Sequence, residues 1–575
     1  MHLNRYIFIL AFLTPAVLRG QGLIIPSGTY VISKGNIVLQ ANWQNNGSFT
    51  QNTGTVMFNG NAQTLNGGPT VFNNITVGAN STTTISTAGH SLKAVLLSNG
   101  TLQAGGNLTL LSTAGQTALI DGTGAGEVLG NVTMQRYLAS GFGYKYLSSP
   151  FQHATVSELA DDINLGASFP TLYRYDQSLT SSGWVHYVNP SDPLVVMQGY
   201  AANFGTSALP VTADLTGVVN NHTISLPALY NNHQPYTLGF NLVGNPYPSP
   251  IDWDASNGWT KTNIDNAIYY FNAGTVDQYT GTYSSYINGV SSDGIAGNII
   301  GAMQGFFVHV SDGTYPVTGA LSIQNNARIN DLNPVFHKEY PNLAPMLRLT
   351  AAFADESYPA DPMVVYFEDA AGTRFEEQLD ALKRLNTDPR VPNLYALSTD
   401  NAMLSICAWP TLRDSAGAIP LVLQTDRAGW VTFKGQDLER IPSHWHIYLR
   451  DATAKVTRSV QTEAPYRLYL NKGEYKDRFY LVFQRKDDPG PGPGSNNNAV
   501  FNAYSAAGRL YANMQNVAAG RCHITVTNLL GQVILRQELI GNGVHELKGP
   551  LSSGMYIVSF YAPQLQYAKK VLVTQ

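Results

Sequence analysis

The chain has 575 residues, of which 44% are hydrophobic, and its charged fraction of 13% is about half of the ~25% usual for soluble domains. A chain of this length exceeds what one hydrophobic core can organise, so several domains are predicted. The net charge of −4 offers no basic field for nucleic acid or an anionic membrane. With only two cysteines, Cys407 and Cys522, a disulfide framework is excluded.

The first 22 residues have the pattern of a secretory signal peptide. Arg5 supplies the positive charge, and the apolar run from Tyr6 to Leu13 is too short to span a bilayer. Small residues in the stretch 20–22 predict the cleavage site, and no cysteine stands there for lipid attachment. Because no later segment approaches the ~18 apolar residues of a membrane span, we expect an exported protein without a transmembrane segment.

Residues 23–136 are almost free of charge, with Lys93 the one charged residue between Gly35 and Ile120. Short apolar pieces alternate with Asn-Gly turns at intervals of about ten residues. Strands this short can bury a face only by stacking, and uncharged Asn and Thr at the turns stack without repulsion. A β-solenoid is the favoured interpretation, and a sandwich of short strands is the alternative. The apolar pieces are Ile37–Leu39, Val56–Phe58, Ile75–Val77, Val95–Leu97, Leu108–Leu110 and Val132–Met134.

Residues 137–334 are dense in tyrosine and tryptophan and predict an aromatic-rich β domain. The stretch 245–250 holds three prolines, which donate no backbone hydrogen bond, so it is expected to be an extended connector outside any sheet interior. Thr155 and Glu158 have the spacing of a capping box. Apolar residues at helical spacing follow them, which predicts a short helix over 155–163.

Residues 335–486 contain apolar runs separated by Pro and Gly, the pattern of a β-sandwich. Leucines at helical spacing within 375–385 predict one short surface helix there. The stretch 487–498, rich in Pro, Gly and Asn, has nothing to bury and predicts a linker. The strand-like runs are Met346–Thr350, Met363–Phe367, Trp430–Phe433, Trp445–Leu449 and Phe479–Phe483.

Residues 499–575 alternate apolar and polar residues around Asn-Gly turns, which predicts a small antiparallel β domain. Several positions together resemble the type A C-terminal sorting domain of type IX secretion, a family of Bacteroidetes-type bacteria, and this resemblance implies an immunoglobulin-like β-sandwich. The sequence departs from the family at one point: such domains often open with an Asn-Pro pair, and the stretch 501–504 has none. The residues that carry the resemblance are Asn528, Gly531, Gln532, Gly554, Tyr556, Lys569 and Lys570.

The resemblance implies an address rather than an activity. Members of the family cross the periplasm, are recognised by an outer-membrane translocon through this domain, and lose the domain after passage. The product is then secreted or attached to the outer cell surface. The upstream regions resemble uncharacterised modules of such secreted proteins, and this second resemblance implies no chemistry.

Two pairs of polar residues are candidate sites. His444 and His446 flank a tryptophan in a strand-like run and could share a metal, but no third or fourth ligand is apparent, and a strand with a wet His face is the alternative. Asp252 and Asp254 could hold Ca²⁺ or form an acid/base pair, or simply cap turns. Cys407 lies in a strand-like run, where a buried structural cysteine is favoured over a nucleophile.

Other motifs are incomplete. His545 begins a zinc-protease pattern, but Gly549 replaces its second histidine, and neither a nucleophile elbow nor a phosphate-binding loop occurs. Aromatic side chains suit stacking on sugars. For Trp184, Trp253 and Trp259, burial as core plugs is the alternative to such a role.

These observations assign no catalytic, metal-binding or cofactor-binding residue, and no cofactor is expected. We expect a non-enzymatic secreted or cell-surface protein with an adhesive, structural or glycan-binding role, whose ligand is a glycan or a surface protein. The alternative is a secreted polysaccharide hydrolase. A cleft lined by well-separated carboxylates would favour the hydrolase, whereas an exposed aromatic strip would favour the binder.

Overall fold

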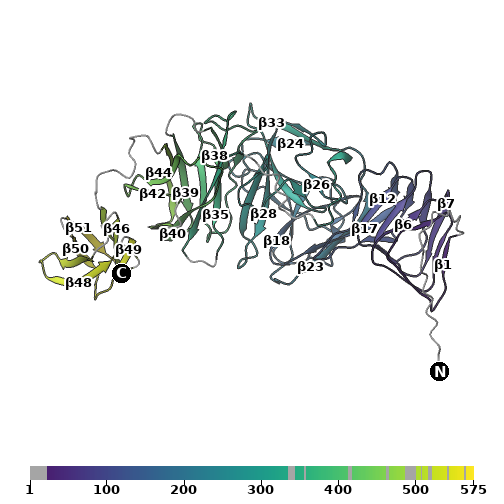
Figure 1. Ribbon diagram of the computed structural model, residues 1–575, viewed down its shortest axis with the longest axis horizontal. Coiled ribbons are helices and arrows are strands. Elements are labelled where there is room, and N and C mark those ends of the chain that lie inside the picture. The colour runs from purple at the N-terminus through teal and green to yellow at the C-terminus, as the bar shows by residue number, and fades with distance from the viewer. Residues whose placement is uncertain are drawn as a thin grey trace, which may run out of the picture. The chain divides into compact units, whose positions relative to one another are not determined.

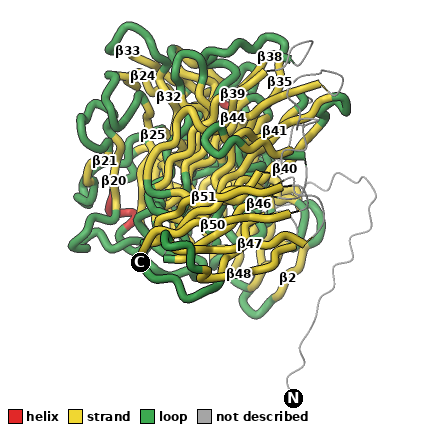
Figure 2. Tube along the Cα trace, turned by 90° about the vertical axis from the view of Figure 1, so that its left-hand side faces the viewer, coloured by secondary structure: helices red, strands yellow, loops and turns green. Residues whose placement is uncertain are grey.

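The computed structural model describes residues 22–333, 344–354, 358–411, 417–461, 465–485, 500–506, 508–515, 521–540, 543–562 and 565–574. Apart from Gly22, the predicted signal peptide lies outside these residues, as does the whole predicted linker 487–498. Over the described ranges, the regular elements are strands plus two short 3-10 turns, η1 (Val156–Leu159) and η2 (Asn325–Ala327), so the all-β prediction is confirmed (Figures 1 and 2). Within the same ranges no helix is long and apolar enough to cross a membrane.

The chain forms two compact units. The first comprises Met1–Ser443, Ile447–Tyr466 and Asn471–Val482, and the second comprises His444–His446, Arg467–Leu470 and Phe483–Gln575. The first unit therefore holds the predicted solenoid, the aromatic-rich region and nearly all of the first sandwich.

The N-terminal part of the first unit is a β-solenoid, as predicted. Strands β1 to β15 form five three-strand turns, and β16 and β17 begin a sixth. Each strand pairs in parallel with its counterparts one turn away: Trp43 lies opposite both Leu23 and Leu65. The first sheet contains β1 (Leu23–Ile25), β4 (Trp43–Asn45), β7 (Ala62–Gly67), β10 (Thr82–Ile85), β13 (Thr101–Gln103) and β16 (Glu127–Leu129). The third contains β3 (Ile37–Leu39), β6 (Thr55–Phe58), β9 (Asn74–Val77), β12 (Val95–Ser98) and β15 (Leu119–Ile120).

The second sheet of the solenoid closes the stack. Its last parallel strand, β17, pairs antiparallel with β23 over eight residues, so the parallel edge is covered rather than left open. The apolar core continues past this point to Leu147, Phe151 and Met303 of the next region. The sheet contains β2 (Tyr30–Ser33), β5 (Ser48–Gln51), β8 (Val71–Phe72), β11 (His90–Leu92), β14 (Leu108–Leu110), β17 (Asn131–Leu138), β23 (Val211–Val219) and β19 (Phe151–Gln152).

The solenoid turns explain the Asn-Gly pairs in its sequence. Gly67 has φ +98°, and a Cβ there would lie 2.2 Å from the carbonyl oxygen of Asn45 in the preceding turn. The side chain of Asn45 is fully buried and donates to the Thr70 hydroxyl at 2.9 Å. Glycine thus allows the close approach of successive turns, and asparagine satisfies polar groups between them.

The aromatic-rich region contains four small sheets. The first is β18 (Tyr144–Ser148), β22 (Gly199–Asn203), β20 (Leu172–Tyr175) and β21 (Trp184–His186). The second is β25 (Phe240–Gly244), β32 (Gly305–Val310), β28 (Ile264–Ala273), β29 (Gly281–Ile287) and β30 (Val290–Ser291). The others are β24 (Ile224–Asn231), β33 (Val317–Ile323) and β27 (Trp259–Thr262), and the pair β26 (Ile251–Asp252) and β31 (Ile299–Ile300).

The proline-rich connector 245–250 lies between strands β25 and β26, as predicted, and is buried. Asn245 donates its side-chain amide to the carbonyls of Ser249, Ile300 and Gly301, at 2.8–3.2 Å. Arg328 donates to the Ser249 hydroxyl at 2.8 Å. Side-chain hydrogen bonds therefore tie this connector, whose prolines cannot donate to a ladder, to neighbouring segments, which gives it a structural role.

The predicted helix over 155–163 is wrong, since only the single 3-10 turn η1 forms. Thr155 makes no side-chain cap, and the Glu158 carboxylate accepts instead from the backbone amide of Thr216 in β23 at 3.1 Å. The apolar face is nevertheless buried, through Val156 and Leu159. A tertiary hydrogen bond has replaced the local one on which the capping-box prediction depended.

Residues 344–485 form the predicted β-sandwich. All its strands belong to one hydrogen-bonded sheet, but Phe433 of β40 and Phe479 of β44 lie 5.0 Å apart without their strands being neighbours, so the sheet closes into two facing layers. Its order is β42 (Val456–Ser459), β41 (Trp445–Asp451), β44 (Gly473–Arg485), β39 (Gly417–Thr425), β37 (Asn393–Leu397), β38 (Met403–Pro410), β35 (Asp361–Glu368), β34 (Met346–Phe353), β40 (Gly429–Glu439) and β43 (Tyr466–Leu470), with β36 (Ala381–Leu382) beside β38.

The helix predicted within 375–385 is also wrong. Asp380 accepts from the backbone amides of Glu376 at 2.8 Å and Ala408 at 2.7 Å, which holds a turn, and the chain then enters β36. Leu379 and Leu382 pack on the core between the sandwich and the aromatic-rich region. The helical leucine spacing therefore reflects an irregular buried segment.

The second unit contains a seven-stranded sandwich, as predicted. Its core includes Ile524, Val526 and Phe560, and the Phe560 ring stacks on Phe501 of the facing sheet at 5.1 Å. One sheet is β45 (Val500–Ala506), β46 (Arg509–Gln515) and β49 (Gly543–Leu547). The other is β48 (Val533–Ile540), β47 (Arg521–Asn528), β50 (Gly554–Ala562) and β51 (Leu565–Val573).

Candidate functional site

An aromatic cleft opens in the middle of the first unit. It encloses about 370 Å³, within the range of small-ligand sites. Eight of its twelve lining residues are Tyr, Trp or Phe, and none is Asp or Glu. The rings belong to Tyr144, Tyr146, Phe169, Tyr173, Trp184, Phe271, Tyr279 and Tyr283.

The alternation of side chains along a strand explains why these rings face the cleft. Tyr144 and Tyr146 are two residues apart on β18, so both side chains leave the same face of that strand. Phe271 of β28 stacks on Tyr146 with the ring centroids 5.0 Å apart and the planes 19° apart. The ring of Trp184, on β21, lies 5.8 Å from the ring of Tyr146. Trp184 is partly buried: it packs on the apolar core, as the core-plug interpretation has it, and it also lines the cleft.

The mouth of the cleft is the part open to solvent. Phe169 is 52% exposed and Tyr279 is 47% exposed, and their rings meet edge to face at 4.8 Å. Both lie in loops, beyond the strands that form the walls. Large apolar rings left half-exposed side by side are a feature of binding surfaces more than of a core.

The floor of the cleft rests on a buried cation. The hydroxyls of Tyr146 and Tyr283 are hydrogen-bonded at 2.9 Å, and Nη2 of Arg384 donates to the Tyr283 hydroxyl at 3.4 Å. The Arg384 guanidinium lies over the rings of Phe307 at 3.8 Å and Phe240 at 4.6 Å. Arg384 comes from the segment of the sandwich that follows β36, so two regions of the sequence build this floor.

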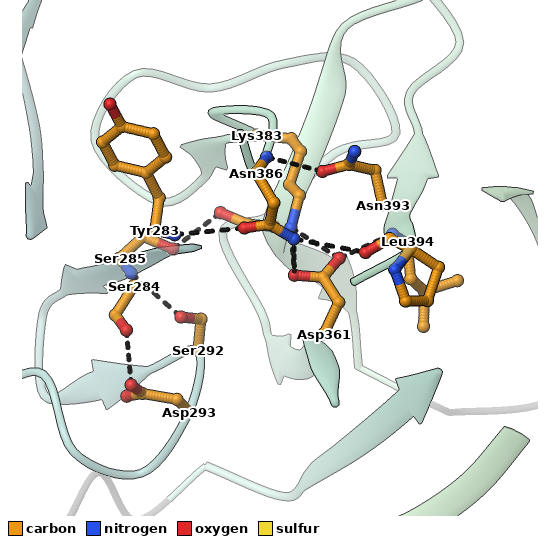
Figure 3. Close-up of polar contacts among 12 residues, drawn as sticks. Tyr283, Ser284, Ser285, Ser292, Asp293, Asp361, Lys383, Asn386, Asn393 and Leu394 are labelled. Carbon is orange, nitrogen blue, oxygen red and sulfur yellow. Dashed lines mark hydrogen bonds and ion pairs between the residues drawn. The ribbon is translucent and has the colours of Figure 1, made fainter. Parts of the chain in front are cut away.

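A buried polar network holds the segment that carries Arg384. Nζ of Lys383 lies 2.6 and 2.7 Å from the two carboxylate oxygens of Asp361, and both side chains are almost wholly buried (Figure 3). Asn386 donates to the same carboxylate at 2.8 Å, and the Leu394 amide donates at 2.6 Å. The carboxylate is therefore fully satisfied, as a buried charge requires.

The same segment is tied to the wall of the cleft. The Asn386 side-chain oxygen accepts from the Tyr283 amide at 3.1 Å (Figure 3). Thr387, which lines the cleft, exchanges hydrogen bonds with Gly281 at the start of β29, at 2.9 and 3.0 Å. The position of Arg384 and Thr387 at the cleft is thus set by the Asp361 network.

Burial keeps three phenols of the cleft, those of Tyr144, Tyr146 and Tyr173, protonated. Burial, followed by the charge of Tyr283, raises the pKa of Tyr146 well above its ordinary value. Burial likewise raises the pKa of Tyr144 and of Tyr173. These hydroxyls can therefore donate as well as accept hydrogen bonds at any physiological pH. No carboxylate lines the cleft, so none is placed there for acid/base catalysis.

Asp252 and Asp254 line a separate shallow depression with Ala255, Ser256, Asn257 and Asn326. Asp252 accepts from the Asp254 amide at 2.9 Å, so it caps the turn as the structural alternative predicted. Asp254 accepts from the Tyr286 hydroxyl at 2.5 Å, and burial, opposed by that hydrogen bond, raises its pKa.

The other candidates from the sequence, His444, His446 and Cys407, do not line the cleft. Trp445 is buried at the start of β41, with His444 exposed in the turn before it and His446 partly buried after it. Cys407 is a free, buried cysteine of β38, as predicted, and burial raises the pKa of its thiol well above the ordinary value. Over the described residues, no three His, Cys, Asp or Glu side chains are placed to hold a metal.

Trp253 is almost wholly buried, as the core-plug interpretation predicted. Its indole N–H donates to the Asn266 carbonyl at 2.7 Å, and Nζ of Lys261 lies 3.6 Å above its ring. Trp259 meets Trp253 edge to face at 4.8 Å and is partly buried. These two tryptophans thus belong to the structural core beside the Asp252 depression.

The residues of the sorting-domain resemblance have defined places in the second unit. Asn528, Gly531 and Gln532 form the exposed turn between β47 and β48, where Asn528 accepts from the Gln532 amide at 3.0 Å and Gly531 has φ +79°. Tyr556 is buried in β50, two residues after Gly554, and its hydroxyl donates to the Ser552 carbonyl. The pair Lys569 and Lys570 is exposed on β51.

Fold and cleft together define a multidomain all-β protein in which a β-solenoid leads into a region with an aromatic-lined cleft. Residues 36–483 match a family described as a domain of unknown function (DUF8693), and the chain belongs to that family. No curated protein matches the chain. Among solved structures, a biofilm associated protein (BSP domain) aligns with 77% of this chain at 10% identity and a TM-score of 0.15. The chain spans 63% of the length of that structure.

Proposed function

We propose that the protein is an exported, non-enzymatic binding protein of the cell surface whose aromatic cleft binds a saccharide. The observation that carries this proposal is the composition of the cleft wall: eight rings, two of them half-exposed at the mouth, and no carboxylate among the lining residues. The flat apolar face of a sugar ring stacks on such side chains, while tyrosine hydroxyls meet its polar groups. A hydrolase would instead need an acid and a base facing each other across the cleft.

Export through type IX secretion is part of this proposal. In support, the turn holding Asn528, Gly531 and Gln532 and the pair Lys569 and Lys570 lie on the surface of the second unit, where a translocon could contact them. The signal-peptide pattern and the sorting-domain resemblance indicate the same destination. The proposed product is secreted or attached to the outer cell surface.

The binding proposal is tested on a glycan array with the mature chain and two variants, Phe169→Ala and Tyr279→Ala. Each removes a half-exposed ring from the mouth, so the fold should be preserved. Losing ~1 kcal/mol of stacking per ring corresponds to about 5-fold weaker binding. Tyr236→Ala is the matched control, since Tyr236 is 70% exposed and does not line the cleft. Unchanged binding by both mouth variants would contradict the proposal.

One observation favours a second candidate, a hydrolase centred on the Asp252 depression. The raised pKa of Asp254 next to a second carboxylate is what a general acid requires. Turnover of a polysaccharide by the wild type that is abolished in Asp254→Asn, with the fold intact, would support the hydrolase. Turnover that is absent from the wild type on a broad panel would exclude it.

A further inference from the structure

We infer that the cleft selects a saccharide carrying an anionic group, because the buried guanidinium of Arg384 fixes the direction of the tyrosine hydrogen bonds at the floor. This inference rests on the proposed saccharide binding and names the class of ligand. It depends on three features: the uncompensated charge of Arg384, the chain of hydroxyls in front of it, and two further cations behind the same wall.

Within the described part of the chain, the charge of Arg384 has no anionic partner. Among the described residues, no carboxylate lies within ion-pair distance of its guanidinium, and its buried Nε meets no acceptor. Four aromatic rings surround it, those of Tyr175, Phe240, Tyr283 and Phe307, at 3.8–5.8 Å. Cation–π contacts offset part of the desolvation cost, but they leave the net charge in place.

The hydrogen-bond chain carries this polarity into the cleft. Arginine can only donate, so the Tyr283 hydroxyl accepts from Nη2 and is free to donate its own proton to Tyr146 at 2.9 Å. The Tyr146 hydroxyl, having accepted, then presents its proton toward the cleft that it lines. Such a donor, polarised by a cation behind it, prefers a charged acceptor.

Two more cations strengthen the positive potential behind this wall. Arg136 and Lys145 line a second, smaller pocket that shares Tyr146 and Phe271 with the cleft. Nζ of Lys145 donates to the Phe142 carbonyl at 2.7 Å, and within the described residues neither cation has a carboxylate at ion-pair distance.

One carboxylate, that of Asp293, also lines the second pocket, where it could oppose these cations. It accepts from the hydroxyls of Ser284 and Ser291 and from the amides of Ile295 and Ala296. Four neutral donors thus stabilise its charge, and it forms no ion pair with the cations. Arg384, Arg136 and Lys145 therefore outnumber Asp293, the one carboxylate among the residues that line the two pockets.

The ligand class follows from this chemistry: a sugar ring stacks in the cleft while its carboxylate or sulfate group accepts from Tyr146. The test measures, by titration calorimetry with the mature chain, the affinity for three oligosaccharides of equal length, one of uronic acids, one sulfated and one neutral. Wild type should bind one or both anionic ligands at least about 10-fold more tightly than the neutral one, a preference that falls as salt is added. The two anionic arms distinguish carboxylate from sulfate.

Tyr146→Phe is the main variant, since it removes the donor but keeps the ring. It should weaken binding of the preferred anionic ligand by about 10- to 100-fold and that of the neutral ligand much less. Arg384→Met should abolish the preference, and Tyr146→Phe keeps the test decisive if Arg384→Met does not fold. Tyr175→Phe is the control, because Tyr175 contacts Arg384 but does not line the cleft.

Equal affinity of the wild type for anionic and neutral ligands, or an unchanged preference in Tyr146→Phe, would overturn this inference and leave saccharide binding standing. Failure of the wild type to bind any saccharide would overturn the proposed function together with it.

Discussion

Replacing Lys383 by methionine tests whether the Asp361 network holds the floor of the cleft. The substitution keeps the length of the side chain but removes the ammonium that lies 2.6 and 2.7 Å from the two carboxylate oxygens. Asp361 is 1% exposed and would keep only the hydrogen bonds from Asn386 and Leu394. Breaking a buried pair in this way costs about 3–5 kcal/mol, because an uncompensated charge remains.

The assay is urea unfolding of wild type, Lys383→Met, Asp361→Asn and the double variant at pH 7. Removing both charges leaves neither Lys383 nor Asp361 as a buried ion without its partner, so the double variant should lose less stability than the sum of the single losses. Lys383→Met should also weaken saccharide binding, because Lys383 precedes Arg384 and anchors its segment. A loss below about 1 kcal/mol in Lys383→Met, or strictly additive losses in the double variant, would refute the reasoning.

Three further predictions concern the solenoid and the C-terminal unit. Burial lowers the pKa of His90 from 6.5 to about 4, so as pH falls between these values the unfolded chain binds a proton that the folded solenoid excludes. Stability should therefore fall by about 2 kcal/mol at pH 5 in the wild type but not in His90→Leu, and equal losses in urea titrations of both would contradict this. Ile524→Ala and Val526→Ala should each cost about 2–4 kcal/mol, because both side chains are fully buried, and near-wild-type thermal melting would contradict it. Deleting 499–575 should retain the protein in the periplasm, and mass spectrometry of the exported wild type should find its C-terminus within or just after 487–498; equal export of the truncated chain would refute the sorting proposal.

The solenoid and both sandwiches were predictable because their signals are local. Apolar triplets such as Ile75–Val77, separated by Asn-Gly turns, report strands whose partners lie one turn away in the sequence. The strand that holds Ile524 and Val526 shows the same alternation in the sequence as in the burial of its side chains. The two helices failed for the opposite reason. Glu158 bonds an amide 58 residues away and Asp380 one 28 residues away, and no local pattern contains those partners.

The cleft could be predicted only in part. The density of tyrosine and tryptophan in residues 137–334 is plain in the sequence, and Trp184 is one of the tryptophans that suit stacking on sugars. Nothing in the sequence placed Arg384 and Thr387 beside them, because that contact depends on tertiary packing of a segment more than 200 residues further along the chain. The lysine–arginine pair within the leucine-rich stretch 379–385 was a signal in retrospect, since it places charge in an apolar context.

The central claim, that a saccharide binds in the aromatic cleft, is tested most directly by the fluorescence of the one tryptophan that lines it. Titrating the mature wild-type chain with an oligosaccharide that it binds should change the tryptophan emission of the protein, because a sugar in the cleft alters the surroundings of Trp184. The change should disappear in Trp184→Phe while calorimetry still detects binding, and it should persist in Trp259→Phe, whose ring packs on Trp253 outside the cleft. An emission change that persists in Trp184→Phe would place the ligand elsewhere and contradict the account.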